Sequence, residues 1–105
     1  MKKVIFMGDS LTRIRDFPLS ARQDAGFQID NVQRGENPDD WKPIKTVGKG
    51  VKEIRIQEVR GHYRAIYLAN IKNSVYVLHA FQKKTRQTRK SDIELARKRL
   101  QEIGV

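Results

Sequence analysis

The sequence predicts an α+β fold in which helices pack on a small, mostly antiparallel sheet. Two observations carry this prediction. Apolar residues in the first third and in the last segment recur at helical spacing, whereas the middle of the chain consists of successive strand-like segments. The expected order of elements is strand, helix, helix, strand, strand, strand, helix. A chain of 105 residues fits one domain, so residues 1–105 are expected to form a single unit.

The first third of the chain is expected to contain one strand and two helices. Residues 4–7 are apolar and partly β-branched, which indicates a short buried strand. Leu11 and Ile14 suit one face of a short helix, and Pro18 suits the first turn of the helix after it. The core-facing stripe of that second helix consists of residues at helical spacing: Ala21, Ala25, Ile29 and Val32.

Residues 37–50 are expected to form a loop. Positions 37–40 combine Asn, Pro and two Asp residues, which is typical of a turn. Trp41 is the only aromatic residue in this stretch. We therefore expect the side chain of Trp41 to fix the loop against the core.

Three strands are expected between residues 51 and 81. Ile54 and Ile56 alternate with polar residues, which indicates a strand with one buried face. Residues 63–71 and 75–81 are almost continuously apolar, and turn sequences precede and separate them. Continuous apolar strands are typical of sheets covered on both faces, so the sequence predicts an antiparallel meander with further layers on either side.

The last segment is expected to form an amphipathic helix. Ser91 and Glu94 have the spacing of a capping box, in which each side chain bonds the backbone amide of the other residue. Gly104 is expected to end this helix. Its apolar stripe consists of Ile93, Ala96, Leu100 and Ile103.

The composition points to a polyanionic partner. The 22 Lys and Arg residues outnumber the 12 Asp and Glu residues, which gives a formal net charge of +10. This charge suits nucleic acid or the ribosome. No apolar run approaches the roughly 18 residues of a membrane span, and the apolar run at positions 4–7 is too short for a signal peptide. We therefore expect no membrane partner and a cytoplasmic location.

Cations are expected to meet on one face of the sheet. Arg55 lies between two isoleucines of one strand, Arg64 lies in an otherwise apolar strand, and Lys83 and Lys84 follow the end of a third strand. Arg86 belongs to the same basic run. If the strands are neighbours, these side chains could converge on a phosphate of RNA. The alternative is that each cation is solvated, and composition alone favours that alternative for Arg55.

Other chemistry has less support in the sequence. His62 and His79 invite an acid–base role because free imidazole titrates near neutral pH, but a single histidine in a strand is more often structural. Neither a metal-ligand spacing of acidic residues nor a glycine-rich phosphate loop is present, and the chain has no cysteine. We therefore expect no metal and no organic cofactor.

From residue 41 onward, several motifs occur in an order that is fairly specific. They are Trp41-Lys42-Pro43, Lys52-Glu53-Ile54-Arg55-Ile56, Tyr63-Arg64-Ala65-Ile66-Tyr67, the run VLHAFQKKTRQT at positions 77–88, and the helix at 94–99. In these motifs the chain resembles the HigB-like, phage-associated branch of the RelE/ParE toxin superfamily. It departs from the family pattern at Lys52, where an aromatic residue is frequent, and at Arg89, where proline is frequent. The first 40 residues match only in layout.

The resemblance implies a RelE-like fold and a toxin of a type II toxin–antitoxin system. Such a toxin is a ribosome-dependent endoribonuclease that cuts messenger RNA in the ribosomal A site, and its cognate antitoxin is usually a helix-turn-helix protein. The basic catalytic positions of the family fall on five residues here: Arg55, Arg64, Lys83, Lys84 and, less directly, Arg86. We expect metal-independent cleavage by attack of the 2′-hydroxyl on the scissile phosphate.

Two alternatives remain open at this point. A ParE-like inhibitor of DNA gyrase shares the same scaffold and cleaves nothing, so the fold does not decide between the two. A nucleic-acid-binding module without catalysis would also carry the basic cluster.

Overall fold

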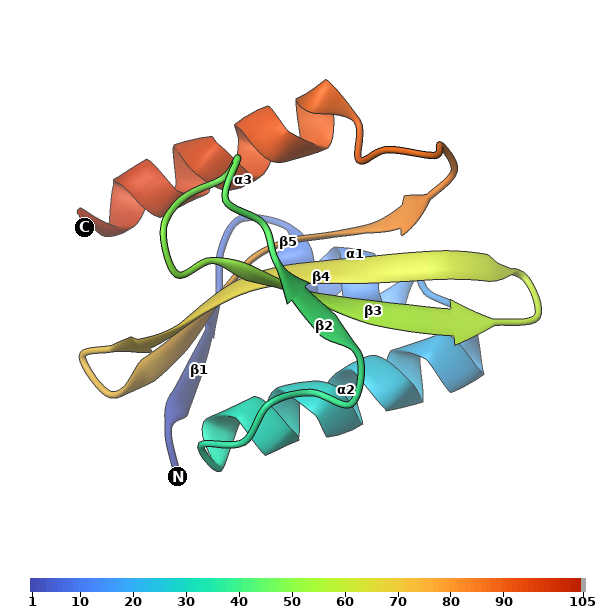
Figure 1. Ribbon diagram of the computed structural model, residues 1–105. Helices are drawn as coiled ribbons and strands as arrows, with labels where there is room; N and C mark the ends of the chain where they lie inside the picture. Colours follow the sequence, from blue (N-terminus) through green and yellow to red (C-terminus); the bar gives the residue numbers. More distant parts are fainter. Residues whose placement is uncertain (105) are drawn as a thin grey trace.

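The computed structural model describes residues 1–104, apart from the side chain of Asn70. Figure 1 shows a sheet with helices on both sides. In chain order the elements are β1 (Lys3–Phe6), α1 (Ser10–Arg15), α2 (Leu19–Gln33), β2 (Trp41–Pro43), β3 (Lys52–Glu58), β4 (Gly61–Ile71), β5 (Ser74–Lys83) and α3 (Lys90–Ile103). None of the described helices combines the length and the apolar character needed to cross a membrane.

The sheet has the strand order β1-β5-β4-β3-β2. Strands β3, β4 and β5 form the expected antiparallel meander, β2 pairs antiparallel with β3, and β1 pairs parallel with β5. The predicted α+β class with an antiparallel-rich sheet is therefore confirmed. The turn between β4 and β5 places Lys72 and Asn73 at positive φ, as the hairpin twist requires.

Helices α1 and α2 cover one face of the sheet. The predicted stripe of α2 is buried there, and it packs with Ile54, Ile56 and Tyr63. Pro18 is the N-cap of α2 rather than a residue of its first turn. Its fixed φ suits that position, and its missing amide leaves no donor unsatisfied.

Helix α3 covers the other face. Ala96 is fully buried, and the rest of the predicted stripe is partly buried in the same core, namely Ile93, Leu100 and Ile103. Gly104 ends the helix in the left-handed conformation at φ +82°. With α3 on one side and α1 and α2 on the other, β4 and β5 are covered on both faces, as their continuous apolar sequences predict.

The capping box predicted for α3 is wrong. The helix begins at Lys90 with Arg89 as its N-cap, and no side chain caps it. Ser91 therefore already lies inside the first turn, where its hydroxyl cannot take the N-cap position. Asp92 is instead the side chain that fixes this end of the helix, because its Oδ1 lies 2.8 Å from Nε2 of the buried His79.

The loop predicted at residues 37–50 contains a strand, and Trp41 does not fix it against the core. Strand β2 is only three residues long, and its pairing with β3 is not visible in a local pattern. Trp41 is partly exposed, with Lys52 Nζ 4.4 Å from the centre of its ring. Ile44 and Val47 are the buried residues that anchor the segment against α3.

A β-bulge in β5 decides which residues face α3. Tyr67 pairs with Val77, but Ile66 pairs with His79, so Leu78 is the extra residue of β5. An extra residue reverses the alternation of side chains after it. Lys83 consequently lies on the α3 side, whereas Val77, at another odd-numbered position, faces α1 and α2.

Candidate functional site

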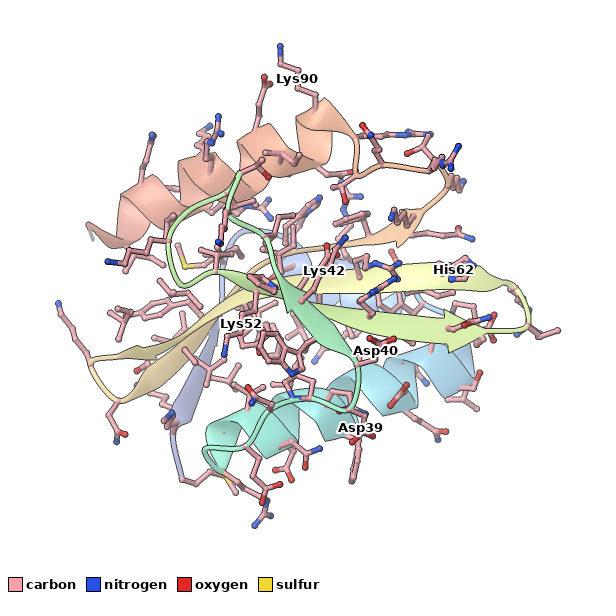
Figure 2. All side chains as sticks on the ribbon, viewed as in Figure 1. Asp39, Asp40, Lys42, Lys52, His62 and Lys90 are labelled. Atoms are coloured by element: carbon pink, nitrogen blue, oxygen red, sulfur yellow. The ribbon has the colours of Figure 1, made fainter. Side chains whose placement is uncertain are left out.

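The strand register brings predicted cations onto one face of the sheet. Arg55 in β3 is directly opposite Arg64 in β4, and His62 in β4 is directly opposite Lys83 in β5. Residues opposite each other in adjacent strands project to the same side. The four side chains therefore share the face that α3 partly covers, and Figure 2 shows His62 near the open end of this face.

An open pocket of about 300 Å³ lies on this face. Four of the five predicted cations line it: Arg55, Arg64, Lys83 and Arg86. The other lining residues are Asp40, Ile56, Gln57, His62 and Thr85. We call this the basic pocket.

Lys84 is not brought to the basic pocket. It directly follows Lys83, the last residue of β5. The Lys84 side chain is exposed and lies outside the pocket lining. The expected cluster therefore contains Lys83 and not Lys84.

Arg64 is the buried cation of the pocket, with only 4% of its surface exposed. Its Nη1 donates a hydrogen bond to the backbone carbonyl of Tyr63 at 3.0 Å, which fixes one side of the guanidinium. Its Nε lies 3.9 Å from Oε1 of Glu53, too far for a hydrogen bond. Burial lowers the pKa of Arg64, and the charge of Glu53 opposes that shift. The guanidinium is thus held in place with donor capacity left over.

Glu53 is the acidic residue beneath this cluster, and the sequence analysis did not single it out. Its side chain is 0% exposed, and both carboxylate oxygens lack a hydrogen bond within the described part of the chain. Besides Arg64, its neighbour is Lys42, whose Nζ lies 3.7 Å from Oε1. Its alternation with Ile54 suggested a solvated residue, because a period-two pattern carries no information on what covers the second face.

Lys83 is half-buried and lies among other cations. Burial lowers the pKa of its ammonium group, and the charge of Arg64 lowers that pKa further. Glu53 acts in the opposite direction and raises it. A lysine with a lowered pKa exchanges protons more readily near neutral pH, which is the property that acid–base chemistry requires.

The two histidines have different positions. His62 lines the basic pocket and is exposed. His79 is fully buried, bonds Asp92 and stacks on Phe81 with ring centres 5.2 Å apart. His79 thus has a structural position outside the pocket, whereas His62 has access to a ligand in it.

The cations of the pocket have few acidic neighbours. Within residues 1–104, no carboxylate oxygen lies within 4.0 Å of a side-chain nitrogen of Arg55, Lys83 or Arg86; the pair Arg64–Glu53 is the contact of this kind. In the same part of the chain, no group of three or more His, Cys, Asp or Glu side chains is placed to hold a metal ion. The pocket lining carries four cations against the one carboxylate of Asp40, so it offers chiefly positive charge and N–H donors.

The antiparallel-rich sheet with helices on both faces and an open basic pocket defines the class: a small α+β protein with a cluster of cations on its sheet. A comparison with family models narrows this class. The model described as phage derived protein Gp49-like (DUF891) matches residues 12–101, so the chain belongs to this family, which is part of the RelE/HigB toxin-like group. The comparison with curated proteins finds no match.

The matched range contains all the cations of the basic pocket. It also begins at residue 12, so the match to the Gp49-like family includes most of α1 and all of α2, where the sequence motifs showed agreement in layout only.

Proposed function

We propose that this Gp49-like protein is a RelE-like toxin of the HigB-like branch that cleaves messenger RNA in the ribosomal A site. One observation carries the proposal: Arg55, Arg64, Lys83 and Arg86 line a single open pocket. Such a pocket suits the phosphate backbone of a single RNA strand, whose unpaired nucleotides can enter a concave site.

The proposed reaction uses the RNA as its own nucleophile. The 2′-oxygen attacks the adjacent phosphorus in line and loses its proton to a base, while the bond from phosphorus to the 5′-oxygen breaks. The leaving 5′-oxygen takes a proton from an acid. The products are a 2′,3′-cyclic phosphate and a 5′-hydroxyl, and no metal or other reactant enters the balance.

The side chains of the pocket match the requirements of this reaction. Arg55 and Arg64 face each other across β3 and β4 and can bind the phosphate oxygens as planar forks. Their charges stabilise the negative charge that builds up at phosphorus. Lys83, with its lowered pKa, and the accessible His62 are the candidates for the proton transfers.

The remaining parts of the proposal follow from the family. A helix-turn-helix antitoxin is the proposed cognate partner, and the cytoplasm, where ribosomes translate messages, is the proposed place of action. Both rest on the likeness to RelE/HigB toxins.

The direct test is primer extension on a translated message after induction of the protein, with the variant Arg64→Ala. We expect discrete cuts within codons for the parent protein. Loss of one phosphate contact made in the transition state costs about 2–4 kcal/mol, so Arg64→Ala should cut about 30- to 1,000-fold more slowly. Arg22→Ala, which removes an exposed arginine of α2 outside the pocket, serves as the matched control.

The outcomes distinguish this proposal from its alternatives. Cleavage by Arg64→Ala at the parental rate would remove Arg64 from the mechanism. Intact transcripts together with damaged DNA would indicate a gyrase inhibitor. Salt-sensitive RNA binding without any cut product would indicate a binding module.

A further inference from the structure

A second hollow of about 440 Å³ adjoins the basic pocket. The two share Lys83 and Arg86, so a ligand that leaves the basic pocket past these side chains enters the second hollow directly. The rest of its wall comes mainly from β2, from the segment after it, and from the segment between β5 and α3, including Lys42, Lys45, Thr46 and Thr88. Glu53 of β3 and Ile93 of α3 complete the lining. Figure 2 shows Lys42 on the side of the sheet that faces α3.

The second hollow is positive although a carboxylate contributes to its lining. Four cations line it, namely Lys42, Lys45, Lys83 and Arg86, whereas Glu53 is its acidic residue. The Glu53 side chain is fully buried, and its Oε1 lies near Nζ of Lys42 and Nε of Arg64. Glu53 thus lies beside two cations, the buried Arg64 and the exposed Lys42, while Lys45 and Arg86 are exposed without an acidic neighbour within 4.0 Å in the described part of the chain.

The wall that carries Lys45 is fixed in place before any ligand arrives. Ile44 and Val47 on either side of Lys45 are buried against α3. The backbone amide of Ile44 donates to the carbonyl of Val51 at 3.0 Å, and Arg97 of α3 donates from Nε to the carbonyl of Thr46 at 2.8 Å. A site that is rigid beforehand pays less ordering entropy on binding.

We propose that this second hollow binds the backbone phosphate of the nucleotide next to the scissile phosphate. The inference rests on the proposed function, since it takes the basic pocket as the place of cleavage. The RNA strand runs from the basic pocket across Lys83 and Arg86 into the second hollow, where Lys45 contacts the neighbouring phosphate. The contact holds the strand and takes no part in the bond changes.

The test compares Lys45→Ala with Lys49→Ala. Both lysines are exposed and lie in the same anchored segment, but Lys49 lines neither hollow. Neither change removes a buried side chain, so both variants should fold. The probe is a fluorescein-labelled RNA hexanucleotide with 2′-O-methyl groups, which cannot be cleaved, and its binding is followed by anisotropy from about 50 to 200 mM salt.

We expect Lys45→Ala to bind more weakly and to reduce the slope of log K against log salt by about 0.7, the value of one phosphate contact on a single strand. On programmed ribosomes, the same variant should raise KM and leave kcat unchanged. Lys49→Ala should behave like the parent protein in both measurements.

The possible negative results overturn different claims. Equal salt slopes for Lys45→Ala, Lys49→Ala and the parent would overturn the second subsite, while cuts by the parent protein keep the proposed function. An equal loss with duplex DNA of the same length would overturn the assignment to an RNA strand. A parent protein that cuts no translated message would overturn the proposed function, while a reduced slope specific to Lys45→Ala would still support the subsite as a site for an RNA phosphate.

Discussion

Lys83 and Lys84 are neighbours in the sequence, but only Lys83 lines the basic pocket. Comparing the two lysines therefore separates the effect of positive charge near the pocket from the effect of direct contact with a ligand. Both lysines contribute one charge to the field around the pocket, but only Lys83 can touch a ligand in it.

We expect Lys83→Ala to lower kcat by about 10²- to 10⁴-fold, because general acid–base groups contribute roughly this much. Lys84→Ala should keep kcat within about twofold of the parent, because it removes only an exposed charge. The kcat of each variant is measured as the cleavage rate at saturating concentrations of programmed ribosomes. Equal losses for the two variants would mean that overall charge, rather than position, sets the rate.

Glu53 influences the charged states of the cations around it. Its carboxylate is buried close to the cations of two other strands, Lys42 of β2 and Arg64 of β4. It has two effects on the site. It favours the charged state of Arg64, and it raises the pKa of Lys83, which burial and Arg64 lower.

Replacing Glu53 by Gln keeps the shape and removes the charge. Because the carboxylate raises the pKa of Lys83, its removal lowers that pKa further. The limb of the pH–rate profile that belongs to Lys83 should therefore move to lower pH, whether Lys83 acts as the acid or as the base. A purely structural role for Glu53 would lower the rate equally at every pH, and a limb that stays in place would contradict this prediction.

At the scale of elements, helix α3 is held to the sheet at two points. His79 of β5 bonds Asp92 near the start of the helix. Further along, Arg99 donates from Nη1 to the carbonyl of Leu78 at 2.9 Å and from Nη2 to Asp9 at 2.8 Å. The carbonyl of Leu78, the extra residue of the bulge, thus accepts a hydrogen bond from α3, which ties the helix to the bulge.

Stability is expected to fall in mild acid because of His79. Burial lowers the pKa of His79 below its ordinary value of 6.5, although its bond to Asp92 opposes the shift. Below pH 6.5 the unfolded chain therefore binds a proton that the folded protein binds only at lower pH. Above pH 6.5, His79 causes no loss in the free energy of unfolding. As the pH falls below 6.5, this free energy decreases.

Urea unfolding at pH 7.5 and 5.5 checks this expectation, with His79→Gln as the comparison. Glutamine can still donate to Asp92 but does not titrate, so the variant should lose less stability between the two pH values than the parent does. Asp9 does not interfere in this range, because Arg13 and Arg99 lower its pKa from 3.8 to about 2. An identical loss in both proteins would assign the acid sensitivity to other groups.

For the whole molecule, the order of the long elements could be predicted because the signals are local. Helical and strand periodicities identified both long helices, the meander, and the face that each helix buries. Strand β2 and the anchoring by Ile44 and Val47 could not be predicted in this way. They depend on pairing and packing between distant parts of the chain, which leave no period in three residues.

In the candidate site, too, features with a local sequence signal could be predicted and features that depend on distant parts of the chain could not. Cations at strand positions could be identified in the sequence, and four of them line one pocket. The side on which Lys83 lies depends on the bulge at Leu78, a single extra residue within a continuous apolar run that has no recognisable signal. The environment of Glu53 depends on side chains from other strands, Lys42 of β2 and Arg64 of β4, which the sequence around Glu53 does not reveal.

The electric field of the net charge of +10 reaches RNA at a greater distance than the contacts in the basic pocket do. Lys3, Arg15 and Arg22 are exposed and line neither hollow. Changing all three to Gln should slow RNA association severalfold at about 20 mM salt and have little effect at about 150 mM, where the screening length is about 8 Å. Dissociation should be unchanged, whereas Lys45→Ala should speed it, because only contacts in the complex determine how long RNA stays bound. Stopped-flow anisotropy with the uncleavable hexanucleotide separates the two rates, and a triple variant that associates at the parental rate in low salt would show that the local field of the two hollows alone attracts RNA.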